Sequence, residues 1–362
     1  MKKLFAILFA VLTLCFLSTE CFANPKSAVL IDKNSGRVLF EVNKDEPLSM
    51  ASTTKIITAL IALEQEKPDE YFTVDAKAIM TEGSSMGLKK GDKVTLRALA
   101  AGMLLASGND AANAAAVKIC GSIEAFVKLM NQRAKEMGLE NTSFQTPSGL
   151  DGENHFSTAY DMALLAKNAL SNPDFADLCG AKTYTAEYGN PPYKRKITNH
   201  NKLLFSLEGA TGVKTGFTKK SGRCLVSSAE REGVSLICVT LNCYDDWNYH
   251  SRLYEEYFGK LKAEEIEYPD EIKIPVCGGT EEYAEAKAVH FSAAFMEGEA
   301  EKTEVIISRP PFVFAPVEKG DIIAKAIFSL EGEIIGEVPI IAEDSVSSLE
   351  KDDFWNRIKE IF

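Results

Sequence analysis

Ser52 and Lys55 are the first residues in the chain whose types and spacing could do chemistry. They begin and end the tetrapeptide Ser-Thr-Thr-Lys, and an apolar run over residues 56–63 follows. Because residues three apart lie on one side of a helix, the hydroxyl and the amine can meet. A serine becomes a useful nucleophile when a base takes its proton, and a lysine can be that base only when it is neutral. Burial against the apolar run and repulsion from a second cation would both lower the lysine pKa.

The pair also has a simpler interpretation, in which Ser52 caps a helix and Lys55 stays in solvent. The spacing alone does not decide between the two. A second Ser-x-x-Lys, from Ser348 to Lys351, lies in the tail of the chain, where we expect it to be only part of a helix. Further motifs are therefore needed before the pair favours catalysis.

A turn with polar side chains is predicted at Ser107-Gly108-Asn109. It separates the apolar stretch 99–105 from the Ala-rich stretch 111–117, and both stretches have a helical pattern. Such a turn can present a hydroxyl and an amide to a cleft. An ordinary turn between two helices would have the same composition.

The third motif, Lys214-Thr215-Gly216, lies in the β-branched run 213–217. Its glycine lets another backbone or a ligand approach the strand closely. A strand with a solvated lysine is again the simpler interpretation of this motif alone. The three motifs occur in this order, on a helix start, a turn and a strand, and together they favour one catalytic site.

Together these motifs resemble those shared by class A β-lactamases and penicillin-binding proteins. More specifically, the chain is similar to the low-molecular-weight penicillin-binding proteins, which are serine-type D-alanyl-D-alanine carboxypeptidases. The resemblance covers nearly the whole length and is carried by residues 51–55, 105–112, 156–163 and 212–218. It implies an α/β (α+β) penicillin-binding, β-lactamase-like transpeptidase domain with an antiparallel sheet and a helical subdomain. A small all-β domain and a C-terminal amphipathic helix would follow.

For the first two motifs the resemblance implies the groups that carry out acyl transfer. Ser52 would attack the carbonyl of the penultimate D-alanine of a peptidoglycan stem peptide and form an acyl-enzyme, with Lys55 as the base. Ser107 and Asn109 would relay a proton and hold the substrate amide. Water would then free the shortened peptide, whereas β-lactam antibiotics would mimic the substrate and stay attached.

For the third motif the resemblance implies substrate binding. Lys214 and Thr215 would bind the terminal carboxylate, and Lys214 would also supply the second cation that keeps the catalytic lysine neutral. Gly216 and Phe217 would continue this substrate-binding strand. The backbone N–H groups of Ser52 and Phe217 would form the oxyanion hole, a type of interaction whose loss costs roughly 3 to 4 kcal/mol.

The sequence departs from the family pattern at two positions. Many relatives have a histidine before the Gly-Leu step, whereas this chain has Ser148. Relatives also use an arginine near the carboxylate site, and the matching stretch here does not align cleanly. Arg223 and Arg252 are the two candidates.

Two other functions remain open at this point. A serine β-lactamase would need a second-step base, usually the glutamate of a Glu-x-x-Leu-Asn run, and residues 110–213 contain no such run. A catalytically inert envelope-binding protein of the same fold would have no need for the intact set of six polar residues described above. Both features favour the carboxypeptidase.

The N-terminal segment predicts export. Lys2 and Lys3 precede an apolar run over residues 4–17, and small side chains near Ala23 suit cleavage there, so we expect residues 1–23 to be a signal peptide. The alternative is a membrane anchor, but the run is shorter than the roughly 20 residues that cross a bilayer. We therefore expect a protein of the cell envelope, on the outer face of the cytoplasmic membrane or secreted.

The composition of the 362-residue chain is that of a folded globular protein. Hydrophobic residues make up 46% and charged residues 25%, and 40 basic against 52 acidic residues give a formal charge of −12. This charge disfavours a nucleic-acid partner. The four histidines are scattered and no Cys-x-x-Cys occurs, so neither a metal nor another cofactor is expected. Cys224 and Cys238 lie in neighbouring β-runs; they could form a cross-strand disulfide, although two buried thiols are favoured.

We expect three parts after the signal peptide. Residues 24–261 would form the catalytic domain, which begins with a hairpin around Asn34-Ser35-Gly36. Residues 262–345, rich in Val, Ile, Pro and Gly, would form a small β-rich domain with a hairpin at 330–333. Residues 346–362 would form an amphipathic helix, because apolar side chains near its end follow helical spacing. That helix could lie in a membrane interface or dock on the β domain, and the sequence favours neither.

Overall fold

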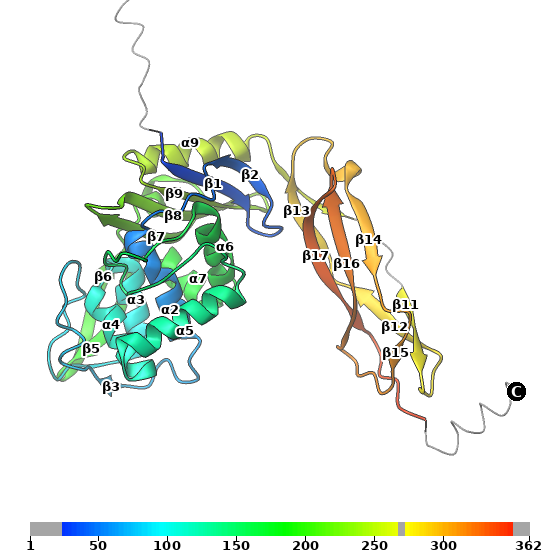
Figure 1. The fold of residues 1–362 in the computed structure, drawn as a ribbon, viewed down its shortest axis with the longest axis horizontal. Helices are drawn as coiled ribbons and strands as arrows, with labels where there is room; N and C mark the ends of the chain where they lie inside the picture. Colours follow the sequence, from blue (N-terminus) through cyan, green and yellow to red (C-terminus); the bar gives the residue numbers. More distant parts are fainter. Residues whose placement is uncertain (1–23, 267–271, 350–362) are drawn as a thin grey trace, which may run out of the picture.

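The computed structural model describes residues 24–266 and 272–349. The predicted signal peptide 1–23 and most of the predicted tail helix, residues 350–362, lie outside the described residues. Within them, the chain forms a mixed domain of helices and antiparallel strands, followed by a separate all-β domain (Figure 1). This architecture confirms the two expected domains of the fold class, and the expected C-terminal amphipathic helix stays a prediction.

The centre of the first domain is a five-stranded antiparallel sheet in the order β2-β1-β9-β8-β7. Its strands are β1 (Ser27–Asp32), β2 (Val38–Val42), β7 (Ala210–Thr218), β8 (Gly222–Arg231) and β9 (Val234–Leu241). Both faces of this sheet are covered. In β1, Val29 packs in the core on the side of the helical bundle, whereas Leu30 packs in the core beneath α9 (Asp246–Phe258). This double burial explains why β1 and β9 are apolar runs without polar alternation.

Helices fill the other side of the sheet. They are η1 (Ala51–Thr54), α2 (Lys55–Leu63), α3 (Leu96–Ala106), α4 (Asn109–Cys120), α5 (Ile123–Glu136), α6 (Ala159–Leu170), α7 (Pro173–Gly180) and the short α8 (Leu203–Ser206). Every residue of α2 is buried, which makes it the central helix of the bundle. Thr95 and Thr158 begin their helices by accepting a hydrogen bond from a backbone N–H in the first turn.

A second, smaller sheet was not predicted. It has the order β3-β4-β5-β6, with strands β3 (Phe72–Thr73), β4 (Lys93–Val94), β5 (Thr183–Gly189) and β6 (Pro192–Thr198). The hairpin of β5 and β6 is hard to recognise because β6 has a single buried residue, Ile197, so its hydrophobic alternation is weak. Tyr188 of β5 is buried, and its hydroxyl donates to the backbone carbonyl of Met86 at 2.7 Å. The hairpin thereby fixes the loop that contains Met86.

The second domain is built from strands alone, apart from one turn of η2 (Ala300–Lys302). A pair of β10 (Lys262–Ile266) and β13 (Phe291–Phe295) lies next to a six-stranded sheet in the order β14-β16-β17-β12-β11-β15. The bounds of the six strands are Glu304–Ser308, Ile322–Leu330, Glu333–Ala342, Tyr283–Ala288, Ile272–Cys277 and Val313–Phe314. Phe291 and Phe328 stack in its core with ring centroids 4.0 Å apart. The predicted hairpin at 330–333 joins β16 to β17.

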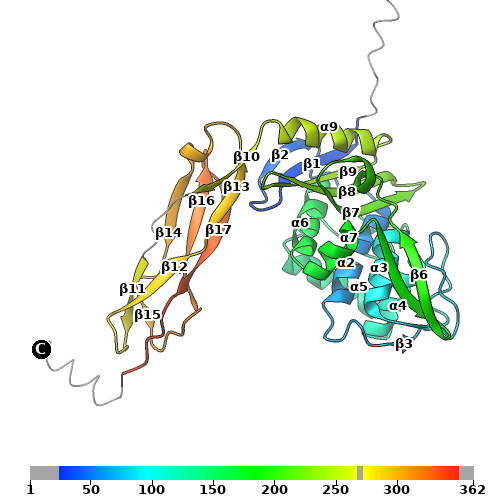
Figure 2. The ribbon, with the colours of Figure 1, turned by 180° about the vertical axis from the view of Figure 1, so that it is seen from behind.

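The two domains meet at the β1–β2 hairpin. The guanidinium of Arg37 donates to Glu299 at 2.7 Å, and the backbone N–H of Ala294 donates to the buried carboxylate of Asp32 at 3.4 Å. Both views place the β domain beside β1 and β2 (Figure 1, Figure 2). In the strand order, β7 forms the opposite edge of the same sheet.

One prediction is confirmed and another needs correction. Cys224 and Cys238 are both buried free thiols, as favoured from the sequence, and they are not cross-strand neighbours, because Cys238 lies opposite Ser227 in the β8–β9 register. The predicted tail helix does not begin at residue 346, since Val346 and Ser348 form isolated bridges to the β domain. Among the described helices, none is long and apolar enough to cross a membrane.

Candidate active site

The nucleophile turn, η1, stands at the start of the central helix. It begins at Ala51, a non-glycine residue with a φ of +49°. Ser52 is half-buried, whereas Lys55, the first residue of α2, is fully buried. The 3-10 turn thus brings the hydroxyl to the surface of the bundle while the amine stays inside.

Three oxygen atoms surround the Lys55 amine. Nζ lies 2.9 Å from Ser52 Oγ, 2.7 Å from Asn109 Oδ1 and 2.5 Å from the backbone carbonyl of Ser148. The amide and carbonyl oxygens can only accept, so they take both hydrogens of a neutral amine. The amine lone pair is then left for the third partner, and the Ser52 hydroxyl donates to it.

The surroundings of Lys55 favour this neutral form. Its pKa lies well below the ordinary value, first because burial penalises the ammonium and second because the Lys214 charge repels it; the Asp110 carboxylate opposes these effects. The amine makes no ion pair with a carboxylate in the described part of the chain. Lys55 is therefore suited to accept a proton from the hydroxyl beside it.

Asn109 connects this lysine to the loop over residues 82–88. Its Oδ1 atom faces Lys55, and its Nδ2 atom donates to the backbone carbonyl of Glu82 at 2.7 Å. The neighbouring Asp110 is buried and accepts hydrogen bonds from the Ser85 hydroxyl and from three backbone N–H groups at 86–88. The loop thereby fixes which end of the Asn109 amide points at the amine.

Ser107 is placed less directly. It ends α3 in the left-handed conformation, with a φ of +59°, and its side chain is only 7% exposed. Among the described contacts, no hydrogen bond joins its hydroxyl to Ser52, Lys55 or Lys214. The structure therefore brings the second motif to the site through Asn109, while the Ser107 hydroxyl is not bonded to the reacting pair.

Strand β7 carries the third motif along the edge of the main sheet. Lys214 is only 1% exposed, and its Nζ donates to the carbonyl of Thr215 at 2.8 Å. Burial lowers the pKa of Lys214 to about 7. A Cβ atom at Gly216 would lie 3.0 Å from the Met50 carbonyl oxygen and 3.1 Å from the Ser52 nitrogen. Glycine is thus what allows the strand to approach the nucleophile turn.

The next residue on the strand, Phe217, lies at the surface. Its side chain is 66% exposed, and it pairs with Arg223 across the β7–β8 register. Because β7 is an edge strand that pairs with β8 alone within the sheet, its other edge can receive an extended ligand, while one face of the strand packs against η1 at Gly216. The eight predicted site residues thus come from η1, α2, the α3–α4 turn and this edge strand.

The two arginine candidates have other partners. Arg223 forms an ion pair with Asp246 at 2.6 Å and lies over the Trp247 ring. Arg252, on α9, lies over the Tyr249 ring, 5.7 Å from its centroid. Arg223 is the register partner of Phe217, but its guanidinium is directed to Asp246 and Trp247.

Sequence reasoning missed the segment that supports the turn from behind. The Ser148 carbonyl binds the lysine amine, and the Pro147 carbonyl accepts from the Thr58 hydroxyl at 2.7 Å. Because the contact of Ser148 is made by the backbone, the absence of a histidine at this position does not remove it. In the sequence, the Pro-Ser-Gly turn was the only feature that marked this segment.

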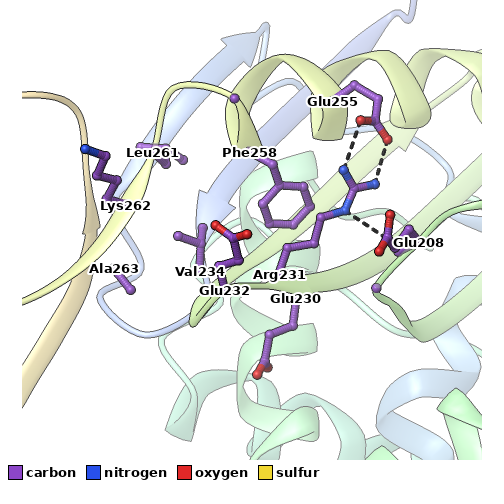
Figure 3. Close-up of a pocket in the computed structure, with 12 residues that line it drawn as sticks. Glu208, Glu230, Arg231, Glu232, Val234, Glu255, Phe258, Leu261, Lys262 and Ala263 are labelled. Carbon is purple, nitrogen blue, oxygen red and sulfur yellow. Dashed lines mark hydrogen bonds and ion pairs between the residues drawn. The ribbon is translucent and has the colours of Figure 1, made fainter.

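A separate hollow lies where α9 leads into β10. This cavity of about 700 Å³ is lined by both charged and apolar residues, with Arg231 and Glu255 paired at its wall (Figure 3). Arg231 forms a two-pronged bond to Glu255 and donates to the Glu208 carbonyl at 3.1 Å. None of the eight predicted site residues is among those that line it.

Comparisons with known proteins agree with this geometry. A family model described as D-alanyl-D-alanine carboxypeptidase (Peptidase_S11) matches residues 18–245, and a model of the penicillin-binding protein 5 C-terminal domain matches residues 264–348. The chain is 32% identical to the D-alanyl-D-alanine carboxypeptidase DacF of Bacillus subtilis over 91% of its own length and 87% of the relative's. It is 33% identical to DacC of Escherichia coli, covering 91% of this chain and 85% of that one.

Solved structures give the same result. Penicillin-binding protein 5 from Haemophilus influenzae superposes with a TM-score of 0.71 at 28% identity, covering 90% of this chain and 98% of the other. The D-alanyl-D-alanine carboxypeptidase DacD from Francisella tularensis gives a TM-score of 0.67 at 26% identity, covering 90% and 94%. With the serine and lysine in contact, and with both family models matched, the chain belongs to the D-alanyl-D-alanine carboxypeptidase family of penicillin-binding serine enzymes.

Proposed function

We propose that this protein is a serine carboxypeptidase that removes the terminal D-alanine from peptidoglycan stem peptides through an acyl-enzyme. The observation that carries the proposal is the 2.9 Å contact between the Ser52 hydroxyl and the Lys55 amine, whose burial and neighbouring cation favour the neutral form. The family supplies the substrate class, and the site supplies the chemistry.

In the first step, Ser52 Oγ attacks the carbonyl carbon of the penultimate D-alanine as Lys55 Nζ takes the hydroxyl proton. The negative charge that forms on the carbonyl oxygen would be bound by the backbone N–H groups of Ser52 and Phe217. The close approach of β7 to η1 at Gly216 supports this assignment. When the peptide bond breaks, the leaving nitrogen takes the proton from the lysine, with Ser107 as the relay.

Substrate position depends on the edge of β7. The terminal carboxylate would be held by the Lys214 ammonium and the Thr215 hydroxyl. Asn109 retains one amide hydrogen for a substrate carbonyl, because an NH₂ group has two and the Glu82 carbonyl takes one. In the second step, water attacks the ester, Lys55 again accepts a proton, and Ser52 is regenerated. A β-lactam would acylate Ser52 by the same attack and stay attached.

The first test is labelling with a fluorescent penicillin, together with release of free D-alanine from a peptide ending in D-Ala-D-Ala. Wild type should do both, and Ser52→Ala should do neither while it keeps its melting temperature. Labelling of Ser52→Ala would show that another nucleophile is responsible. Rapid turnover of penicillin without D-alanine release would instead show a β-lactamase, and no labelling of wild type would show an inert binding protein.

We also propose that the enzyme is exported and acts in the cell envelope. The N-terminal pattern and the extracytoplasmic location of peptidoglycan support this proposal. The mature chain should begin at Asn24, which mass spectrometry of envelope fractions can check. A cytoplasmic full-length chain would contradict export.

The tail supports a second, separate proposal, that the enzyme attaches to the membrane surface. Phe354, Trp355, Ile358, Ile361 and Phe362 have the spacing of one apolar helix face. Deleting residues 353–362 should release the protein from membranes without lowering its activity on a soluble peptide. A full-length protein that never sediments with membranes would favour docking of the tail on the β domain.

A further inference from the structure

The segment over residues 147–155 forms a support behind the nucleophile turn. Its carbonyls bind Lys55 and Thr58, as described above. Gly149, with a φ of +82°, lies so close to the turn that an added Cβ would meet the Ala51 carbonyl oxygen. No side chain larger than hydrogen fits there, so the segment and the turn are held face to face.

His155 adds a side-chain bond at the end of this segment. Its Nε2 atom lies 2.9 Å from the Thr54 hydroxyl, and its Nδ1 atom accepts from the backbone N–H of Gln145 at 2.9 Å. The Thr54 hydroxyl in turn donates to the Ala51 carbonyl at 2.8 Å. Thr54 has one hydroxyl hydrogen, which is used on Ala51, so Nε2 must carry the proton and donate to it.

A chain of two hydrogen bonds therefore runs from His155 through Thr54 to Ala51. Ala51 immediately precedes the nucleophile and has a left-handed backbone, a conformation that costs energy for a residue with a side chain. Such a conformation persists only where neighbouring contacts impose it. We infer that His155 is a positioning residue, which holds the turn in the conformation that aims Ser52 at Lys55 and at the edge of β7.

His155 is not suited to transfer protons itself. Its side chain is only 2% exposed, and both ring nitrogens are already engaged. Burial lowers its pKa to about 4; the nearby Lys220 and Lys55 charges act in the same direction, and Asp151 opposes them. The ring therefore stays neutral around pH 7, and its contribution is geometric.

The chain offers a matched control in His250. This histidine is also fully buried and has both nitrogens bonded, to the Ser227 hydroxyl at 2.6 Å and the Thr240 hydroxyl at 2.9 Å. It lies between the sheet and α9, away from the nucleophile turn. Loss of either ring should destabilise the fold, but only loss of His155 should misplace Ser52.

The test measures acylation of the full chain by a chromogenic β-lactam, and it resolves the maximal acylation rate from the binding constant before acylation. This experiment depends on the proposed function, and acylation of the wild-type protein tests that function separately. If the wild-type protein is not acylated, the proposed function is wrong. With active wild type, His155→Ala should lower the maximal rate about 100-fold with little change in binding, because a misplaced nucleophile reacts slowly. His155→Gln should restore most of the rate, since its amide can donate to Thr54.

His250→Ala should lower the melting temperature but keep the acylation rate of the folded protein. The inference is overturned if His155→Ala reacts like wild type, or if His250→Ala loses as much rate. If His155→Ala does not fold, the variants Thr54→Val and Thr54→Ser test the inference in its place. Valine removes the hydroxyl and should reproduce the loss, whereas serine should keep the rate. Equal rates for these two variants would also overturn the inference.

Discussion

Two buried clusters in the catalytic domain place a serine beside a basic side chain, and only one of them is built for chemistry. In the cluster beneath α9, Ser227 binds His250 at 2.6 Å and the Tyr254 hydroxyl at 2.8 Å. Every group there is buried, and burial lowers the pKa of His250 to about 3, so the cluster is neutral and closed. Its hydrogen bonds serve only the fold.

The cluster at η1 buries two amines, Lys55 and Lys214, and neither has an ion-pair partner among residues 24–266 and 272–349. Burial lowers the pKa of both amines, and the Lys214 charge lowers that of Lys55 further, so the charged forms are costly. The adjoining serine is half-exposed beside an open strand edge. The two clusters differ in that the site at η1 has buried amines without ion-pair partners next to a half-exposed serine. A serine next to a base does not by itself distinguish an active site.

The largest effect on the acylation rate is expected when the Lys55 amine is removed. Lys55→Met should lower the acylation rate by a factor on the order of 10³, because the base is lost. The melting temperature should change little, since removal of a buried amine that lacks a carboxylate partner offsets the loss of its three hydrogen bonds. Stopped-flow acylation and a thermal scan measure the two effects. Acylation at the wild-type rate would exclude Lys55 as the base, and the exposed Lys260→Met serves as the control.

The second amine predicts a pH dependence. We propose above that the Lys214 ammonium binds the substrate carboxylate, and a Lys214 pKa of about 7 means that the free enzyme loses this cation as pH rises through about 7. The value of kcat/KM for a D-Ala-D-Ala peptide should therefore fall about tenfold per pH unit above that point. In Lys214→Met this alkaline limb should vanish. On the acidic side, kcat/KM should rise with pH as Lys55 loses its proton. In Lys214→Met this rise should move to higher pH, because removal of the like charge raises the Lys55 pKa. An unchanged profile would contradict both assignments.

A smaller effect is expected where the strand edge approaches the turn. In Gly216→Ala, the added methyl would meet the backbone of Met50 and Ser52 at 3.0 and 3.1 Å, so the strand must move by a few tenths of an ångström. Acylation should slow about tenfold, because the nucleophile and its oxyanion donors separate. A rate equal to that of wild type would show that this approach is not needed. Thr218→Ala, farther along the same strand, is the control.

The smallest effect on the acylation rate is expected for a substitution in the cluster beneath α9. Tyr254→Phe removes one hydrogen bond to Ser227 and should lower the free energy of unfolding by about 1 kcal/mol. Urea unfolding measures this change. The acylation rate should not change, because the cluster has no contact with the nucleophile turn. Slower acylation of the folded variant would show that the two clusters are coupled.

Much of this organisation could be predicted because it is local in sequence. The three motifs lie on short segments with clear periodicity, and the meander of β7, β8 and β9 follows from β-branched runs and turn residues. The β5–β6 hairpin was not predicted, since β6 buries a single side chain, that of Ile197, and so has little hydrophobic alternation. The support from Ser148 and His155 was also missed, because it depends on backbone carbonyls and on a contact 101 residues apart in the chain. The roles of the predicted site residues stay predictions until the variants are measured.

The attachment of the β domain has a mechanical consequence. It is held at β1, and the catalytic edge is β7, so two strands lie between them; with strands about 4.8 Å apart, three spacings make roughly 14 Å. The β domain is therefore attached on the side of the sheet away from the catalytic edge. If the tail anchors this domain at the membrane surface, as proposed, a longer or shorter β domain would change how far the enzyme reaches into a polymer layer without altering the bond it cuts.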